Sequence, residues 1–199
     1  MLVTTRSAGN PPLPPLRVRS AVYTRDMPEV KSVGLFGPLR HRRAAQRAGF
    51  DDALCVDDRS ALSEGGTWNI GFGLGEQVVW PDAESLAGTT MRLFRQGHAS
   101  VSTTVEIADV TGFDAAFAAN AAIGIRAIGR LDDLPFPETH PLIEELRKEY
   151  AELPGDPLQR RHRGIPWSDR RPTAHTETRP PVSVIANRSE GAPRCVRPT

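Results

Sequence analysis

Three short motifs carry side chains that could do chemistry together. Lys31 is an isolated amine ahead of a Ser-Val-Gly run, Glu64 is a carboxylate that precedes a Gly-Gly pair, and Thr89 and Thr90 follow Gly88 at the start of a predicted helix. An amine can form an imine with an aldehyde, a carboxylate can hold a pyridine nitrogen protonated, and a helix start can bind a phosphate. These are the three parts that a pyridoxal phosphate site requires.

The composition makes Lys31 the candidate for imine chemistry. The chain has 25 basic residues, of which only Lys31 and Lys148 are lysines. Arginine stays protonated in proteins and cannot form an imine, and Lys148 lies in a charged run that predicts a solvated helix face. The alternative for Lys31 is an ordinary surface lysine, because lysines are mostly exposed.

Length, charge and hydropathy limit the class of protein. With 199 residues and a net charge of +1, the chain predicts one main domain with neither a nucleic-acid partner nor an anionic membrane partner. It has no apolar run long enough for a membrane span and no signal-peptide core, so we expect a cytoplasmic protein. Cys55 and Cys195 are far apart and the histidines lack paired spacing, so we predict neither a disulfide framework nor a metal site.

The composition divides the chain into three parts. Residues 1–17 hold a strand-like fragment and a proline-rich run, which predict an extended linker. Residues 18–150 mix strand and helix patterns, which predict a single α/β (mixed α+β) core. Residues 151–199 carry nine arginines and eight prolines with few large apolar residues, so we predict a disordered tail. An arginine-rich arm that binds nucleic acid is the weaker alternative for this tail.

Hydrophobic periodicity places the motifs relative to predicted elements. Strands are predicted at 18–24, 53–56, 68–72, 77–80, 101–107, 115–118 and 123–128, and helices at 38–48, 90–96 and 141–150. Gly49 is expected to end the first helix, and the strands on either side of residues 73–75 are expected to form a hairpin. Lys31 then precedes the first helix, and Glu64 lies near a turn before the hairpin.

In this order and spacing, the motifs resemble those of class IV aminotransferases, the fold type IV pyridoxal phosphate enzymes. The resemblance rests on the runs Val30–Gly34, Ala45–Leu54, Ser63–Ile70 and Leu86–Arg92, and it covers about residues 18–150. The family includes branched-chain and D-amino acid aminotransferases and aminodeoxychorismate lyases. The resemblance implies the C-terminal domain of the D-amino acid aminotransferase-like fold, with pyridoxal 5′-phosphate as cofactor.

The resemblance also implies a role for each motif. Lys31 would form the Schiff base and then move a proton, and Glu64 would pair with the pyridine N–H. Thr89–Thr90 would bind the phosphate at a helix N-terminus, and Asn120–Ala121 would lie in a second loop for the phosphate and the substrate carboxylate. The alternatives are a helix cap or turn carboxylate for Glu64 and plain helix capping for Thr89.

The chain departs from the family pattern at several positions. Phe36 stands where members often have a Tyr near the cofactor, Ala87 replaces the Pro of a common Leu-Pro-Gly run, and Asn120 replaces a frequent Thr. The resemblance implies an N-terminal domain that supplies an arginine to the phosphate and half of the substrate pocket, and we expect this domain to be missing before the proline-rich run.

Three functions therefore stay open. The first is amino-group transfer between an amino acid and a 2-oxo acid, and the second is an aminodeoxychorismate lyase-like elimination. The third is a truncated homologue without activity. The family implies small-molecule substrates and a homodimer, and an uncovered apolar surface would favour self-association.

Overall fold

The computed structural model describes residues 13–154. The predictions for residues 1–12 and for the tail from residue 155 onward lie outside the described residues. Within residues 13–154, no helix is long and apolar enough to cross a membrane.

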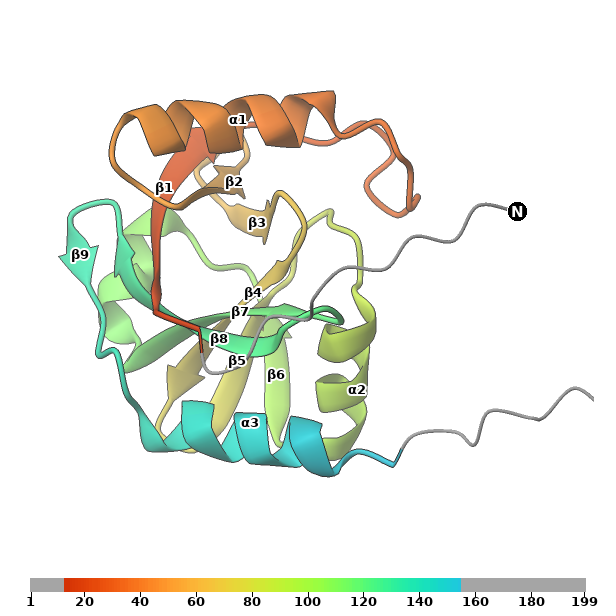
Figure 1. The fold of residues 1–199 in the computed structure, drawn as a ribbon, viewed down its shortest axis with the longest axis vertical. Coiled ribbons are helices and arrows are strands. Elements are labelled where there is room, and N and C mark those ends of the chain that lie inside the picture. The colour runs from red at the N-terminus through yellow and green to blue at the C-terminus, as the bar shows by residue number, and fades with distance from the viewer. Residues whose placement is uncertain (1–12, 155–199) are drawn as a thin grey trace, which may run out of the picture. The chain divides into compact units, whose positions relative to one another are not determined.

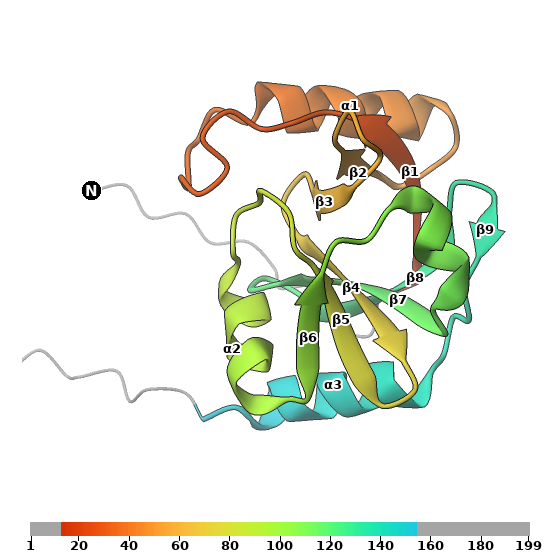
Figure 2. The same cartoon turned by 180° about the vertical axis from the view of Figure 1, so that it is seen from behind.

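Six strands form a closed barrel, whose ring can be followed in Figures 1 and 2. They are β1 (Leu16–Val22), β2 (Asp52–Val56), β3 (Leu62–Gly65), β4 (Asn69–Leu74), β7 (Ala115–Asn120) and β8 (Gly124–Leu131). The strand order is β3-β2-β1-β8-β7-β4, and a β3–β4 pairing closes the ring. Only β1 runs parallel to its neighbours β2 and β8, while the other pairs of the ring are antiparallel.

Further strands and helices extend the barrel. The strands β5 (Gln77–Pro81) and β6 (Ser100–Thr103) continue the sheet from β4, and β9 (Leu134–Pro135) pairs with β8. The helix α1 (Phe36–Arg47) packs beside β1 and β2, whereas α2 (Thr89–Gly97) and α3 (Pro141–Glu152) pack against β7 and β8 (Figure 1). A short 3-10 helix, η1 (Ile107–Gly112), precedes β7.

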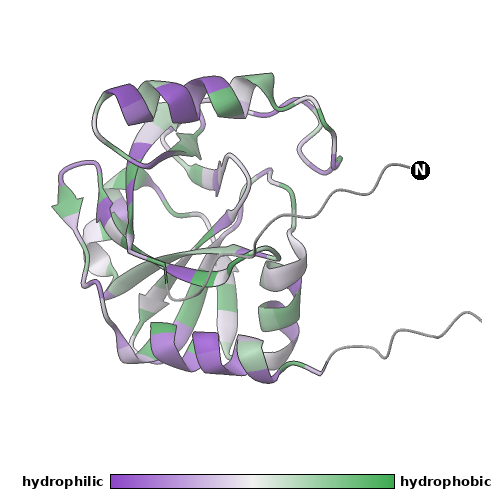
Figure 3. Ribbon diagram, viewed as in Figure 1, coloured by the Kyte–Doolittle hydropathy of each residue, from purple (hydrophilic) through white to green (hydrophobic). Residues whose placement is uncertain are grey.

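The alternation of side chains along β7 separates two hydrophobic cores. Ala116 and Ala118 point into the barrel, where they join Leu54, Ile70 and Phe72 from other strands. Ala115, Phe117 and Ala119 point the other way, into the core that α2 and α3 cover. Successive side chains of a strand face opposite sides of the sheet, so one strand supplies both cores. Figure 3 shows the matching pattern, with hydrophilic bands on the outer helices and hydrophobic residues along the strands.

The predicted α/β core is confirmed, and the differences are local. The sequence missed β3 and β9, because four- and two-residue strands are too short to show a period. The strand predicted at 101–107 ends at Thr103, since Glu106 and Asp109 form a capping box that begins η1 instead. Gly49 ends α1 as expected, with a φ of 86° that favours glycine.

Candidate active site

One cavity of about 300 Å³ contains most of the predicted site residues. Its lining comes from four segments: the loop with Arg25 and Lys31, the β3–β4 region from Glu64 to Asn69, the run Leu86–Thr89, and Asn120–Ala121. Lys31, Glu64, Thr89, Asn120 and Ala121 are therefore brought together, although they are far apart in the sequence. Thr90 is the exception, because it is buried behind this surface rather than in the lining.

Glu64 lies on β3, so the alternative of a helix cap or turn carboxylate is wrong. The residue is 8% exposed, Oε1 accepts a hydrogen bond from Nη1 of Arg25 at 2.9 Å, and Oε2 accepts one from the Leu86 N–H at 3.3 Å. Burial raises the pKa of Glu64, while the hydrogen bond and charge of Arg25 and the charge of Lys31 act in the opposite direction. The result is a desolvated carboxylate whose free lone pairs can accept a further donor in the cavity.

Asn69 joins β4 to the segment that precedes α2. Its Nδ2 donates to the carbonyl of Leu86 at 2.8 Å, and its Oδ1 accepts from the N–H of Gly88 at 3.1 Å. A Cβ on Gly88 would collide with this Oδ1, so the approach requires glycine. Asn69 therefore fixes the segment at the start of α2.

The N-terminus of α2 fits an anion. Gly88 is the N-cap and no side chain caps the helix, so Thr89 is not the cap and that alternative is wrong. The first N–H groups of an uncapped helix have no intrahelical partner and attract negative charge. The first N–H groups of α2 and the hydroxyl of Thr89, which lines the cavity, therefore fit a phosphate. The hydroxyl of Thr90 is buried with no hydrogen-bond partner among the described residues, but it lies outside the cavity lining.

Asn120 shapes the loop between β7 and β8. Its Oδ1 accepts from the N–H groups of Ala122 and Ile123 at 3.0 and 2.9 Å, and its Nδ2 donates to the carbonyl of Thr67 at 3.4 Å. The side chain is therefore occupied within the protein. A contact from this loop to a cofactor would come from the backbone of Ala121, whose residue is exposed in the cavity lining.

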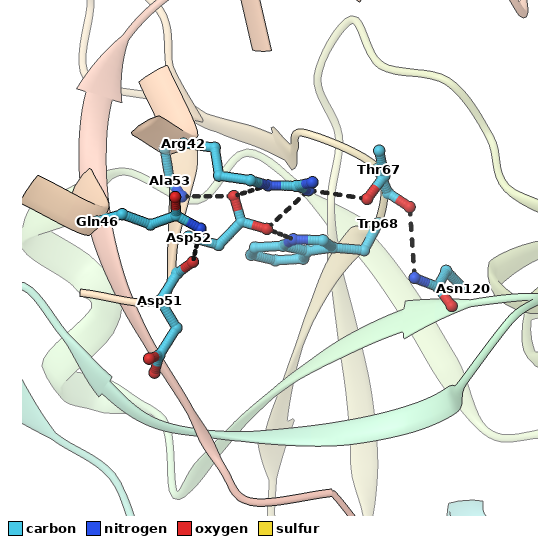
Figure 4. A network of polar contacts seen from close by, with 8 residues as sticks. All are labelled: Arg42, Gln46, Asp51, Asp52, Ala53, Thr67, Trp68 and Asn120. Atoms are coloured by element: carbon cyan, nitrogen blue, oxygen red, sulfur yellow. Dashed lines mark hydrogen bonds and ion pairs between the residues drawn. The ribbon is translucent and has the colours of Figure 1, made fainter. Parts of the chain in front are cut away.

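A buried polar network supports the wall that contains Glu64 (Figure 4). Asp52 on β2 accepts hydrogen bonds from Nε of Arg42 and from the indole N–H of Trp68, both at 2.9 Å. Arg42 on α1 also donates to the hydroxyl of Thr67 at 2.9 Å. The network thus connects α1 and β2 to the turn between β3 and β4. Sequence reasoning missed these contacts, and the only available signal was an acidic residue next to an apolar strand.

The lysine side of the cavity is open. Lys31 is exposed, as is Lys148 on α3, and only Lys31 faces this cavity. Phe36, at the position where the family often has Tyr, is 81% exposed and does not line the cavity. Cys55 lies close to Glu64, but burial raises the pKa of its thiol to about 12, so it is not a nucleophile at neutral pH.

The larger cavity nearby lacks this chemistry. It has a volume of about 600 Å³ and is lined by Met27–Val30 and Asp82–Ser85, which include three carboxylates and no amine. Within residues 13–154, no group of three or more His, Cys, Asp and Glu residues is placed to hold a metal ion. The described residues therefore offer one site with an amine, an acid and an anion-binding helix start.

Comparison with known proteins assigns the chain to a family. The family model for amino-transferase class IV matches residues 2–131. The chain belongs to the class IV amino-transferase family. No match was found among curated protein sequences.

Solved structures of this family share the fold of the chain. The chain is 23% identical to a putative 4-amino-4-deoxychorismate lyase from Legionella pneumophila, with a TM-score of 0.65 over 74% of this chain and 58% of that one. It is 22% identical to an aminotransferase from Brucella abortus bound to the cofactor PLP, with a TM-score of 0.65 over 75% and 57% of the two chains. It is 18% identical to a branched-chain aminotransferase from Thermoproteus uzoniensis, with a TM-score of 0.64 over 70% and 51%. The chain therefore spans little more than half of these relatives.

Proposed function

We propose that the chain binds pyridoxal 5′-phosphate and transfers an amino group between an amino acid and a 2-oxo acid. Lys31 is the residue that carries the cofactor covalently. The observation that supports this proposal is the single cavity lined by Lys31, Glu64 and Thr89, three residues that come from separate segments. Membership of the class IV amino-transferase family supports it independently.

In this proposal each wall of the cavity has one task. The bound cofactor supplies an electron sink for the electron pair left when the substrate Cα loses its proton. Once the substrate amine has displaced it from the cofactor, the Lys31 amine would remove that proton in its neutral form and return it from the protonated form so produced. The Glu64 carboxylate accepts a hydrogen bond from the ring nitrogen. The first N–H groups of α2, the Thr89 hydroxyl and the Asn120–Ala121 loop would bind the phosphate, while Thr90 lies behind them and supports the helix start.

Borohydride reduction in the presence of pyridoxal phosphate tests the covalent role. We expect the cofactor to be fixed on Lys31, as located by peptide mass mapping of the full chain. Lys148 is an internal control, because it is the only other lysine and lies on the exposed face of α3. Labelling mainly on Lys148, or none above a denatured sample, would contradict the proposal.

A lyase-like elimination on aminodeoxychorismate is the second candidate. It is favoured by the fold match to a protein described as a putative 4-amino-4-deoxychorismate lyase. Turnover of aminodeoxychorismate without an added 2-oxo acid would indicate elimination. Dependence of amino-acid consumption on a 2-oxo acid acceptor would indicate transamination.

The third candidate is a homologue with little or no activity. It is favoured by the exposure of Lys31, because water weakens the interactions of charges in an open site. Phe36 is also exposed and does not cover the cavity. In that case, cofactor affinity would be weaker than about micromolar and transamination would stay near background. Titration of the visible absorbance with pyridoxal phosphate separates this case from the first two.

A further inference from the structure

One ion pair connects the lysine-bearing loop to the opposite wall of the cavity. We define the lysine loop as residues 24–35, between β1 and α1, with Lys31 near its centre. Its backbone makes two hydrogen bonds within the loop, from the N–H of Val30 to the carbonyl of Met27 and from the N–H of Leu35 to the carbonyl of Val33, and the Leu35 carbonyl accepts from the N–H of Leu39 in α1. Among residues 13–154, its one recorded polar contact to an element that does not adjoin it is from Arg25 to Glu64, at 2.9 Å.

This contact is mostly shielded from water although the loop around it is exposed. The side chains of Arg25 and Glu64 are 12% and 10% exposed, whereas the flanking residues Thr24 and Asp26 are exposed. A charge-assisted hydrogen bond is stronger away from water, and removal of one partner leaves the other charge buried and unpaired. Breaking this contact would leave a charge shielded from water and without a partner. The contact therefore holds the lysine loop against Glu64.

The ion pair continues into the segment that begins α2. Oε2 of Glu64 accepts from the N–H of Leu86, the carbonyl of Leu86 accepts from Asn69, and Asn69 accepts from the N–H of Gly88. Hydrogen bonds therefore run without a break from Arg25 to the helix start. A carboxylate has about four lone-pair sites, so Glu64 can hold Arg25 and Leu86 and still accept a donor from the cavity.

We propose that Arg25 is a positioning residue that fastens the lysine loop to Glu64 and fixes the orientation of the Glu64 carboxylate. Arg25 thereby sets the distance between the amine of Lys31 and the acid on the opposite wall. This inference rests on the proposed function, in which Lys31 and Glu64 act on the same cofactor. Arg25 itself does not touch the reacting atoms.

Arg25 also has an electrostatic effect on Glu64. The charged or titratable groups around Glu64 are Arg25, Lys31, Tyr23 and Cys55. Burial raises the pKa of Glu64, and the largest opposing effects come from Arg25, by hydrogen bond and by charge. Without Arg25, burial would be less opposed and the carboxyl would protonate at higher pH.

Limited digestion of the full chain with endoproteinase Lys-C tests the fastening. The enzyme can cut only after Lys31, in the lysine loop, and after Lys148, on α3. We expect Arg25→Gln to raise the ratio of cutting at Lys31 to cutting at Lys148 by roughly tenfold, because proteolysis follows the population of the open loop. Glu64→Gln should have a similar effect, and the double variant should add little to either.

The matched control is Arg130→Gln, which removes a surface ion pair with Asp133. Its cutting ratio should equal that of the wild type. An unchanged ratio in Arg25→Gln, or equal increases at both lysines, would overturn the inference. The second result would mean that Arg25 stabilises the whole domain rather than the loop.

Titration of the Glu64 carboxyl by NMR, in the protein without added cofactor, tests the effect on the acid. We expect the midpoint to move to higher pH in Arg25→Gln and to return toward the wild-type value in Arg25→Lys. A midpoint that is the same in all three proteins would overturn the inference. Neither the digestion nor the titration needs bound cofactor. If both give the expected result but borohydride does not label Lys31, the proposed function is rejected and the role of the Arg25–Glu64 contact is kept.

Discussion

The two walls of the cavity differ in how the protein holds them. The sheet wall contains Glu64, Asn69 and Gly88, and it is fixed by hydrogen bonds between β3, β4 and the start of α2. The loop wall is the lysine loop, whose residues are largely exposed and whose one recorded long-range polar contact is through Arg25. Groups that need fixed geometry are best carried on rigid elements, whereas loops tolerate movement. We therefore expect substitutions in the sheet wall to lower the free energy of unfolding more than substitutions in the loop wall do.

Loss of the buried acid behind the sheet wall should have the largest effect. Asp52→Ala removes the partner of Arg42 and of the Trp68 indole, and the residue is only 6% exposed. Because the Arg42 charge is left without its partner, we expect the free energy of unfolding to fall by about 3–5 kcal/mol. Urea unfolding of the variant measures this change.

The matched control for this variant is Asp133→Ala. Asp133 also pairs with an arginine, but its side chain is fully exposed. Exposed ion pairs contribute little to stability, so the control should unfold at nearly the same urea concentration as the wild type. Similar losses in the two variants would show that the Asp52 network does not support the sheet wall.

A methyl group at Gly88 should disturb the sheet wall at its contact with α2. Gly88→Ala places a Cβ against Oδ1 of Asn69, and we expect a loss of about 1–3 kcal/mol and weaker cofactor binding. Gly97→Ala is the control, because nothing lies near that position at the other end of the same helix. The control should be neutral or slightly stabilising, since alanine favours helix more than glycine does. Thermal unfolding and cofactor titration compare the two variants, and equal behaviour would contradict the proposed packing.

The pH dependence of stability should depend on Glu64, where the two walls meet. Because burial raises its pKa, the folded state binds more protons than the unfolded state at pH values above the ordinary carboxyl value of 4.5. The contribution of Glu64 to stability is therefore greatest at low pH and decreases as the pH rises through the raised pKa. Urea unfolding at several pH values should show a smaller decrease over this range in Glu64→Gln than in the wild type. Parallel pH profiles would contradict this assignment.

The smallest effect on stability is expected next to the loop wall, at the first residue of α1. Val33 in the lysine loop is fully exposed and Phe36 at the start of α1 is 81% exposed, so both apolar side chains lack a cover among the described residues. Phe36→Ser should change the free energy of unfolding by less than about 0.5 kcal/mol, because few contacts are lost. It should lower self-association and the binding of a hydrophobic dye, since contiguous apolar surface favours both.

Leu74→Ser is the control for this variant, because Leu74 is also exposed but lies in the β4–β5 hairpin. Light scattering and dye fluorescence should be unchanged in the control. A drop in stability in Phe36→Ser that exceeds the drop in Gly88→Ala would show that the segment next to the loop wall contributes more to stability than the sheet wall does.

The order of the elements could be predicted from the sequence because local patterns specify it. The apolar run in 115–118 and the helical period in 141–150 both correspond to elements of the structure, β7 and α3. The segment around Glu64 could not be predicted as a strand, because β3 has only four residues and takes its stability from pairing with β2 and β4. Such pairing depends on partners that are distant in the sequence.

The sequence by itself determined which residue types are available for chemistry: one lysine outside the charged α3 run, a carboxylate before a Gly-Gly pair, and a Gly-Thr-Thr helix start. Only the tertiary structure decided that Lys31, Glu64 and Thr89 line one cavity, while Thr90 lies behind it. It also revealed the contacts of Arg25 with Glu64 and of Arg42 with Asp52. The physical reason is that periodicity reports which face of an element is buried, whereas the partner of a buried polar group is set by how the barrel closes.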